Sequence, residues 1–308
     1  MESLQVYLSR LVKKWMTYIR EVNTMINQKA KTARIIKILL THIILLMFVI
    51  IVLWPVIFSF VSSFKSSGEI LAAKEFWPKE WKWDNYLRAW KGANFSGYTF
   101  NTVWYSVVIM VLSVFVNSLS GYVFARGMFP GKQLFFTIRT VMLFLSMGSA
   151  TLYPQFRILS ELGLSKTLWG LILISVGTGS VTHIFMVRAF VLSLPKEMDE
   201  AAAIDGCSFM GTFFRITLPL IRPIIMALAV LSFRGAWNDY LFPMVVTFTQ
   251  PEKRTLAVGL YSMQHTVAGM DWSIMLPGTI ISAMPLIIIY IFLNKYFIES
   301  LTLGAVKG

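Results

Sequence analysis

Six long apolar stretches divide the sequence, and polar or charged residues separate each one from the next. A helix needs about 20 mostly apolar residues to cross the hydrocarbon core of a bilayer. The stretches that meet this length lie at about 38–62, 100–124, 134–156, 167–192, 220–246 and 276–297. The pattern therefore predicts an all-α membrane protein with six transmembrane helices. The first stretch begins too late, and is too long, for a cleaved signal peptide.

The residues before the first stretch follow a different pattern. Apolar side chains recur every three or four positions from Leu4 to Ile26, which predicts an amphipathic helix. Residues 1–37 also contain eight Lys or Arg residues. A basic amphipathic helix binds an anionic leaflet, and contact with a partner subunit is the alternative. Because Lys and Arg in the flank of the first helix favour the cytoplasmic side, we expect the N-terminus inside.

This topology divides the chain into four parts. They are a cytoplasmic amphipathic helix at 1–37, the first span with an extracellular aromatic loop at 38–99, a membrane core at 100–297 and a cytoplasmic tail at 298–308. The loop contains four Trp residues and several Lys residues. Since Trp and Tyr favour the headgroup zone, we expect an interfacial helix there, with stacking on sugars as the alternative.

Composition and charge narrow the class of protein. Hydrophobic residues make up 56% of the chain and charged residues 14%, whereas soluble domains contain about 25% charged residues. In a soluble protein the net charge of +13 would suggest nucleic acid, but here an anionic cytoplasmic leaflet explains it better. The single cysteine, Cys207, excludes an internal disulfide, and the three histidines lie far apart. We find no set of residues that would make a membrane enzyme.

The most informative polar segment, 195–219, precedes the fifth span. Pro195 is suited to a first helical position, and Glu197 begins an acidic first turn. Three alanines then favour helix, and Gly206 can end it in the left-handed conformation. We expect a second short helix that Pro219 ends. A small-surfaced helix can lodge in a groove of a partner, and an ordinary amphipathic loop is the alternative.

This segment resembles the EAA loop that marks the membrane permeases of binding-protein-dependent ABC importers. The residues that carry the resemblance are Glu200-Ala201-Ala202, Gly206, Ile216 and Leu218-Pro219. Further similarities are Gly121–Arg126, like the family's turn after the second span, and Trp237–Tyr240, like the pattern in carbohydrate-importing members. The resemblance covers about 38–308 and is closest to the second permease subunit of the maltose type.

The resemblance implies a type I importer permease fold with a cytoplasmic coupling helix, in a bacterial cell membrane. It also implies a complex with a second homologous permease, two cytoplasmic ATPase subunits and an extracellular solute-binding protein that delivers a sugar. ATP and Mg would bind the ATPase subunits, because this chain lacks a G-x-x-x-x-G-K-[ST] phosphate loop. The chain itself would bind no cofactor or metal. The predicted ATPase-coupling residues are Glu200, Ala201, Ala202, Asp205, Gly206, Ile216, Leu218 and Pro219.

Two further groups are candidates for contact with solute and binding protein. Charged residues within a bilayer usually face protein or water, so we expect Arg234 and Asp239 to pair across helix contacts. The predicted substrate-path residues are Trp237, Asn238, Asp239 and Tyr240. The predicted binding-protein contacts in the loop 247–275 are Gln264, His265, Asp271 and Trp272. A plain connecting loop is the alternative there.

Two other functions remain open from the sequence. The same architecture could import a non-sugar solute, such as a glycerol phosphate ester or a peptide. An ion-coupled secondary transporter would need acidic residues in several spans, and Asp239 is the only acidic residue well inside one.

Overall fold

The computed structural model describes residues 35–92, 94–144, 148–264 and 270–305. The chain divides into two units, residues 1–59 and 60–308. The described residues form helices and connecting loops, with no strand. In the first unit they belong to the helix Ile35–Ser62, which is long and apolar enough to cross a membrane. The predicted amphipathic helix of the N-terminal residues lies outside the described part of the chain.

Two helices of the second unit are also long and apolar enough to cross a membrane, and two bent pairs may each be counted as one span. The long helices are α4 (Phe95–Arg126) and α15 (Trp272–Ala305). The bent pairs are α7 (Leu168–Thr178) with α8 (Val181–Ser193), at 45°, and Phe209–Leu220 with α12 (Arg222–Trp237), at 82°. Five of the six predicted spans therefore correspond to a helix or a bent pair. Because α15 continues to Ala305, most of the predicted tail at 298–308 is helical.

The third predicted span, 134–156, is not one continuous helix in the described residues. The helix α5 (Lys132–Val141) ends well before α6 (Leu152–Glu161) begins. Gly148, between them, has a φ of +50°, which lies outside the range of a right-handed α-helix. The apolar pattern identified the segment, but the small residues within it were a sign of the break.

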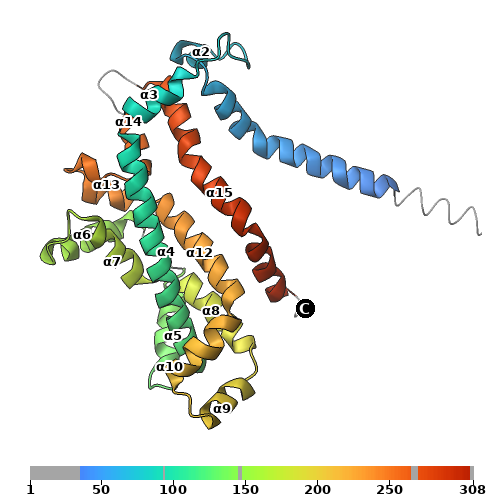
Figure 1. Cartoon of the computed structure of the whole chain (residues 1–308), viewed down its shortest axis with the longest axis vertical. Coiled ribbons are helices and arrows are strands. Elements are labelled where there is room, and N and C mark those ends of the chain that lie inside the picture. The colour runs from blue at the N-terminus through green and yellow to red at the C-terminus, as the bar shows by residue number, and fades with distance from the viewer. Residues whose placement is uncertain (1–34, 93, 145–147, 265–269, 306–308) are drawn as a thin grey trace, which may run out of the picture. The chain divides into compact units, whose positions relative to one another are not determined.

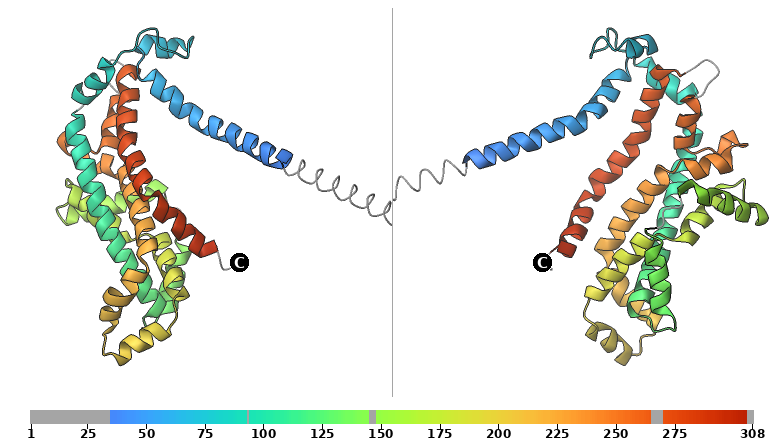
Figure 2. Two further views of the ribbon diagram at one scale, coloured as in Figure 1. Left: turned by 45° about the vertical axis from the view of Figure 1, so that its right-hand side comes forward. Right: turned by 180° about the vertical axis from the view of Figure 1, so that it is seen from behind.

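Shorter elements connect the long ones. They are α2 (Ser67–Ala72), α3 (Asp84–Gly92), η1 (Gly148–Thr151), α9 (Glu197–Ile204), α10 (Phe209–Thr212), η2 (Phe213–Thr217), α11 (Leu218–Leu220), α13 (Leu241–Thr247), η3 (Pro251–Lys253) and α14 (Leu256–Gln264). Within the second unit, α3 and α14 lie at one end of α4, and α9 and α10 lie at the other (Figures 1 and 2).

Both bends have visible local causes. At the first, Arg139 Nη2 of α5 donates to the Thr178 carbonyl at 2.9 Å, and Asn117 Oδ1 of α4 accepts from the Ser180 amide at 3.1 Å. Gly179 between them has a φ of +60°. The backbone groups that the break frees are therefore bonded by neighbouring spans, as a membrane interior requires.

The second bend lies at Ile221. The predicted helix end at Pro219 is one residue early, because the helical run Phe209–Leu220 continues through Pro219 to Leu220. The five residues before α11 form a π-helical turn, η2. Such a turn widens the helix and commonly accompanies bends.

Three buried clusters lie along α4 in the described residues, and one of them consists of Phe95, Tyr98, Phe233, Trp237 and Leu256. The other two flank the break between α7 and α8. The first, here called the Tyr105 cluster, consists of Tyr105, Ile109, Leu159, Leu168, Leu171, Ile172, Ala236, Phe242 and Val246. The second, the Tyr122 cluster, consists of Tyr122, Val187, Val191, Phe213, Ile221, Ile224 and Leu228. The first thus joins α4 to α7 and α13, and the second joins α4 to α8 and α12. The break between α7 and α8 separates them.

The predicted extracellular aromatic loop packs within the second unit. Phe64 is 2% exposed and its ring lies 4.7 Å from that of Trp83. Asn85 Nδ2 donates to the carbonyls of Ser63 at 3.0 Å and Lys65 at 2.9 Å. Buried polar contacts of this kind fix the loop, although the sequence suggested only a surface element beside the first span.

Candidate functional site

The segment between α8 and α12 turns at the end of the unit where α9 lies (Figure 1). The helix α9 begins at Glu197, so Pro195 precedes it rather than opening it. The acidic residues of its first turn stabilise the helix, because they lie at the positive end of the helix dipole. Gly206 follows with a φ of +77°, as predicted for a glycine stop. Ser208 Oγ then accepts from the Gly211 amide at 3.1 Å and begins α10.

The helix α9 presents a narrow surface of small and acidic residues. The exposed members of the predicted coupling set on this helix and its turn are Glu200, Ala201, Asp205 and Gly206. Ala202 is only 2% exposed and faces its own chain. Ile204, which the sequence analysis omitted, is 87% exposed. The available signal was an isoleucine in the last turn of a helix whose other residues are mostly small or acidic.

The other predicted coupling residues have a different environment. Ile216 and Leu218 are half-buried, and Leu218 packs against the Tyr122 cluster. Pro219 is exposed. The structure thus separates the predicted set into an exposed surface on α9 and a supporting part near the bend.

Arg126, at the end of α4, holds α9 in place. Its Nε lies 2.6 Å from Asp199 Oδ2, in an ion pair without hydrogen-bond alignment. Its Nη2 donates to the Leu194 carbonyl at 2.8 Å. Sequence analysis identified Arg126 only as part of a turn motif and did not connect it with Asp199. The partners are 73 residues apart, so no local pattern relates them.

Tyr122 holds the other end of the same segment. Its hydroxyl donates to the Phe209 carbonyl at 3.3 Å, and its ring lies 4.7 Å from that of Phe209 and 5.1 Å from that of Phe213. Tyr122 is 1% exposed. The end of α4 therefore contacts both the start and the finish of the segment that contains α9.

This end of the unit is electropositive. Lys132 Nζ donates to the carbonyls of Ala125 at 3.3 Å and Gly127 at 2.9 Å. Burial, and then the neighbouring charges of Arg188 and Lys196, lower the pKa of the Lys132 ammonium. The cations near Lys132 and the acidic residues of α9 together form a charged surface that could complement the charges of another protein.

Trp237 is part of the packed interior. It is 2% exposed, its Nε1 donates to the Ser282 carbonyl at 3.1 Å, and its ring stacks on Phe233 at 5.4 Å. Its indole therefore joins α12 to α15, and its predicted contact with solute would need these helices to separate.

The other predicted path residues lie between α12 and α13. Asp239 Oδ2 accepts from the Tyr105 hydroxyl of α4 at 3.2 Å, so this residue does pair across a helix contact. The Tyr240 ring lies 4.4 Å from that of Tyr261, joining α13 to α14. Asn238 is exposed, and its amide donates to the Arg234 carbonyl at 3.0 Å. The structure thus brings these residues together at the junction between α12 and α13, where only Asn238 of the predicted path residues is exposed to solvent.

Arg234 differs from the expectation of a paired charge. It is exposed on α12, one helical turn before Asn238, and no ion pair holds its guanidinium within the described residues. A guanidinium in a span is costly against lipid. This face of α12 therefore meets water or protein.

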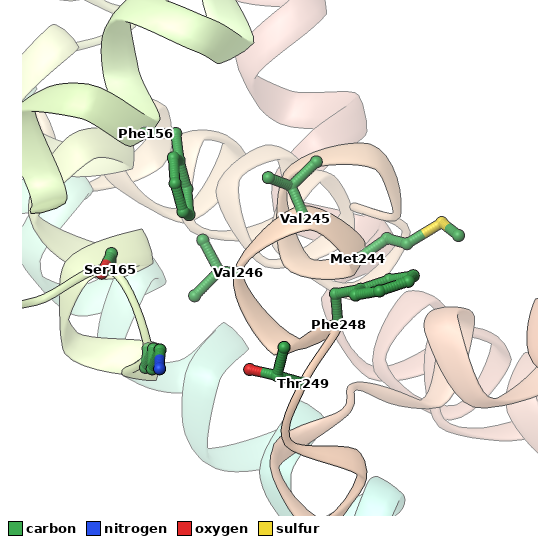
Figure 3. A pocket seen from close by; sticks show the side chains of 8 residues that line it. Phe156, Ser165, Met244, Val245, Val246, Phe248 and Thr249 are labelled. Carbon is green, nitrogen blue, oxygen red and sulfur yellow. The ribbon is translucent and has the colours of Figure 1, made fainter.

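A separate cavity of about 430 Å³ lies between α13 and the end of α6 (Figure 3). It is lined by Phe156, Ser165, Lys166, Met244, Val245, Val246, Phe248 and Thr249. None of the predicted path residues lines it. Its largely apolar wall is suited to hydrocarbon or a packed side chain rather than to a hydroxyl-rich solute.

The predicted binding-protein loop is described in part. The helix α14 ends at Gln264, whereas His265 lies outside the described residues. Trp272, half-buried, begins α15. The Gly259 backbone of α14 lies directly against the Tyr98 ring of α4, so this loop is fixed to the core at one side.

Asp271 makes bonds within its own chain. Its Oδ1 accepts from the hydroxyls of Ser67 and Ser273, both at 2.6 Å, and its Oδ2 lies 3.3 Å from Arg88 Nη2. Partial burial raises the pKa of this carboxyl. The hydrogen bonds from Ser273 and Ser67 and the charge of Arg88 lower the pKa by more than burial raises it, so the pKa lies below its ordinary value. Asp271 thus joins α2 and α3 to α15.

The apolar helices, the two broken spans and the exposed helix α9 define a polytopic membrane permease. One chain of a crystal structure of a bacterial ABC transporter involved in import of the acidic polysaccharide alginate has this fold. The TM-score is 0.72 at 23% identity, over 84% of this chain and 95% of that chain. The family of binding-protein-dependent transport system inner membrane components matches residues 92–302, and the chain belongs to this family.

Relatives of nearly the same length support this membership. The arabinooligosaccharides transport system permease AraQ of Halalkalibacterium halodurans is 34% identical, over 91% of this chain and 100% of its own length. The maltodextrin transport system permease MdxG of Bacillus subtilis is 28% identical, over 91% and 99%. The diacetylchitobiose uptake system permease NgcG of Streptomyces coelicolor is 31% identical, over 87% and 88%.

Proposed function

We propose that this chain is the permease subunit of an ATP-driven importer that moves an oligosaccharide delivered by an extracellular solute-binding protein. The observation that carries the proposal is similarity over nearly the whole chain to permeases named for arabinooligosaccharides, maltodextrin and diacetylchitobiose. These solutes share repeated sugar units and hydroxyl-rich surfaces. We therefore assign an oligosaccharide as the solute class, because all three named solutes are oligosaccharides.

ATP hydrolysis is assigned to two cytoplasmic ATPase subunits that dock on α9. No phosphate-binding loop occurs in the sequence, so this chain binds neither ATP nor Mg. The exposed Ile204 supplies an apolar anchor, and Glu200 beside it supplies a charge for a basic groove. An apolar anchor ringed by polar groups is the usual composition of a protein contact.

Transport then consists of a change in access driven from α9. Closure of the ATPase subunits moves α9, and the bends at Gly179 and Ile221 allow parts of the spans to tilt. The solute path runs along the open face of α12 at Asn238, shared with a second homologous permease. The binding protein is assigned to the loop between α13 and α15, which contains the predicted contact residues. The N-terminus remains assigned to the cytoplasmic side of a bacterial cell membrane.

Reconstitution of the full importer in proteoliposomes tests this function. The chain is combined with its second permease, ATPase subunits and binding protein, and uptake of labelled arabino-, malto- and chito-oligosaccharides is measured. We expect uptake that needs both ATP and binding protein. Uptake that continues without either one refutes the proposal, and uptake of glycerol phosphate esters or peptides alone refutes its sugar component. An uptake that a collapsed ion gradient abolishes indicates a secondary transporter.

A matched pair of variants tests the docking surface. Glu200→Gln removes a charge from α9, whereas Glu161→Gln removes one from the exposed end of α6. We expect Glu200→Gln to reduce coupled ATPase activity on the order of 10-fold, within the range of typical coupling free energies. Glu161→Gln should leave it unchanged. Equal activities of the two variants would show that Glu200 does not contribute to docking.

A further inference from the structure

One arginine joins α4 to both sides of the turn that leads into α9. The Leu194 carbonyl, which accepts from Arg126 Nη2 at 2.8 Å, belongs to the residue that ends α8. Asp199, whose Oδ2 lies 2.6 Å from Arg126 Nε, is in the first turn of α9. Leu194 itself is extended, with a ψ of 142°. The guanidinium therefore spans the non-helical connection between the two helices.

The geometry of this bridge restricts movement. The side chain of Arg126 is 9% exposed and that of Asp199 is 28% exposed, so solvent screens the pair less than it screens a surface pair. A guanidinium is planar and rigid, so the hydrogen bond at Nη2 and the ion pair at Nε hold the two joined groups at a fixed separation. A lysine could supply the charge but not the same two directions.

A second contact of α4 reinforces the first. Tyr122 lies one helical turn before Arg126, on the same face of α4. It donates to the Phe209 carbonyl at 3.3 Å, at the far end of the segment that contains α9. The same helix runs to the opposite end of the unit, where Asn101 Nδ2 donates to the Glu252 carbonyl at 2.8 Å. Thus α4 connects the α9 segment with the loop before α14.

We propose that Arg126 is a positioning residue of the transport cycle, which makes α9 and α4 move as one body. The proposal rests on the proposed function, because it assumes that ATPase subunits move α9. Without the bridge, the connection at 194–196 would bend and absorb that movement. With it, the movement passes into α4 and along it to the opposite end of the unit.

Distance measurements on the assembled importer test this directly. Spin labels are attached at Glu197→Cys on α9 and at Val111→Cys on α4, both exposed positions, in a Cys207→Ser background. Pulsed electron paramagnetic resonance compares the nucleotide-free complex with the complex trapped by ATP and vanadate. We expect the label distance to stay constant in the otherwise unaltered chain. It should differ between the two states in Arg126→Gln and in Asp199→Asn.

Transport per ATP provides the functional measurement. With the oligosaccharide that the unaltered importer takes up, Arg126→Gln should retain ATP hydrolysis and lose transport per ATP by on the order of 5- to 150-fold. Arg126→Lys should restore part of it. The control is Arg157→Gln, which breaks an exposed pair on α6 with side chains 69% and 66% exposed. It should change neither quantity.

Two results overturn the proposal. The first is an Arg126→Gln complex with a constant label distance and normal transport per ATP. The second is failure of both Arg126→Gln and Asp199→Asn to assemble while Arg157→Gln assembles, which would make the bridge a folding contact. The unaltered complex separates this proposal from the function itself. If that complex imports nothing or ignores ATP, the proposed function fails. If it is active and Arg126→Gln is equally active, only the bridge fails.

Discussion

A close approach of α4 to α8 at Gly121 predicts a specific loss of stability. A Cβ placed at Gly121 of α4 would lie 2.5 Å from Val187 Cβ and 2.6 Å from Val187 Cγ1 on α8. Carbon atoms pack best at about 3.5–4.0 Å, so Gly121→Ala requires the helices to separate by roughly 1 Å. Val187 is fully buried in the Tyr122 cluster and cannot turn away. Small residues let helices pack closely in membranes.

Overpacking of this kind costs about 1–3 kcal/mol. A cost of about 2 kcal/mol lowers the Tm of a chain of this size by roughly 3 °C. We expect this shift for Gly121→Ala in detergent, followed by intrinsic fluorescence and by size-exclusion chromatography after heating. Because membrane proteins often unfold irreversibly, all variants are heated at one rate.

Two further variants make this prediction sharp. Gly177→Ala is the control, since a Cβ there meets nothing within 4 Å, and it should not lower the Tm. Gly121→Ala combined with Val187→Gly moves the glycine to the facing helix. The pair should be more stable than the sum of the single effects by about 1 kcal/mol or more. A Tm of Gly121→Ala equal to that of the unaltered chain would refute the close contact of α4 with α8.

Three other changes have definite expected outcomes. Gly206→Ala should destabilise the turn after α9 by about 1 kcal/mol, because the φ of +77° strains a residue with a Cβ. In the coupled ATPase assay used for Glu200→Gln, Gly206→Ala should therefore lose more activity than Gly206→Asn, since asparagine tolerates this conformation better. The lowered pKa of Asp271 means that its stabilising contribution is complete above its unfolded pKa and is lost as pH falls through the folded pKa. Asp271→Asn should therefore make the fall in Tm between pH 7 and pH 3 smaller than in the unaltered chain, and an equal fall would contradict this. Tyr105→Phe should cost about 1 kcal/mol of stability by removing one of three donors to Asp239, and an unchanged Tm would mean that the Tyr240 and Phe242 amides are sufficient for this carboxylate.

Hydrophobic pattern and composition predicted most of the membrane architecture. A stretch of about 20 apolar residues has few alternatives to a span, so α4 and α15 follow directly from the sequence. The glycine stop at Gly206 was also predictable, because a short acidic and alanine-rich run before a glycine defines both ends of a helix. The bends were less so. Pro219 suggested the end of a helix, whereas the chain bends at Ile221, where tertiary packing decides.

The contacts that hold the candidate site could not be predicted from local pattern. The pair of Arg126 with Asp199 depends on the return of the chain through α5, α6, α7 and α8. Trp237 appeared to be a solute-stacking residue from its neighbours in sequence, but its indole bonds to the Ser282 carbonyl of α15. In both cases the function of the side chain depends on a helix that is distant in sequence.

The separation of the Tyr105 cluster from the Tyr122 cluster has a consequence for how such a chain can diversify. The helix α7 contributes to the Tyr105 cluster and α8 contributes to the Tyr122 cluster, and the break at Gly179 lies between these two helices. Substitutions that reshape the Tyr105 cluster can therefore accumulate without disturbing the packing around α9. Sequence change in one cluster can thus proceed while the other cluster keeps its packing.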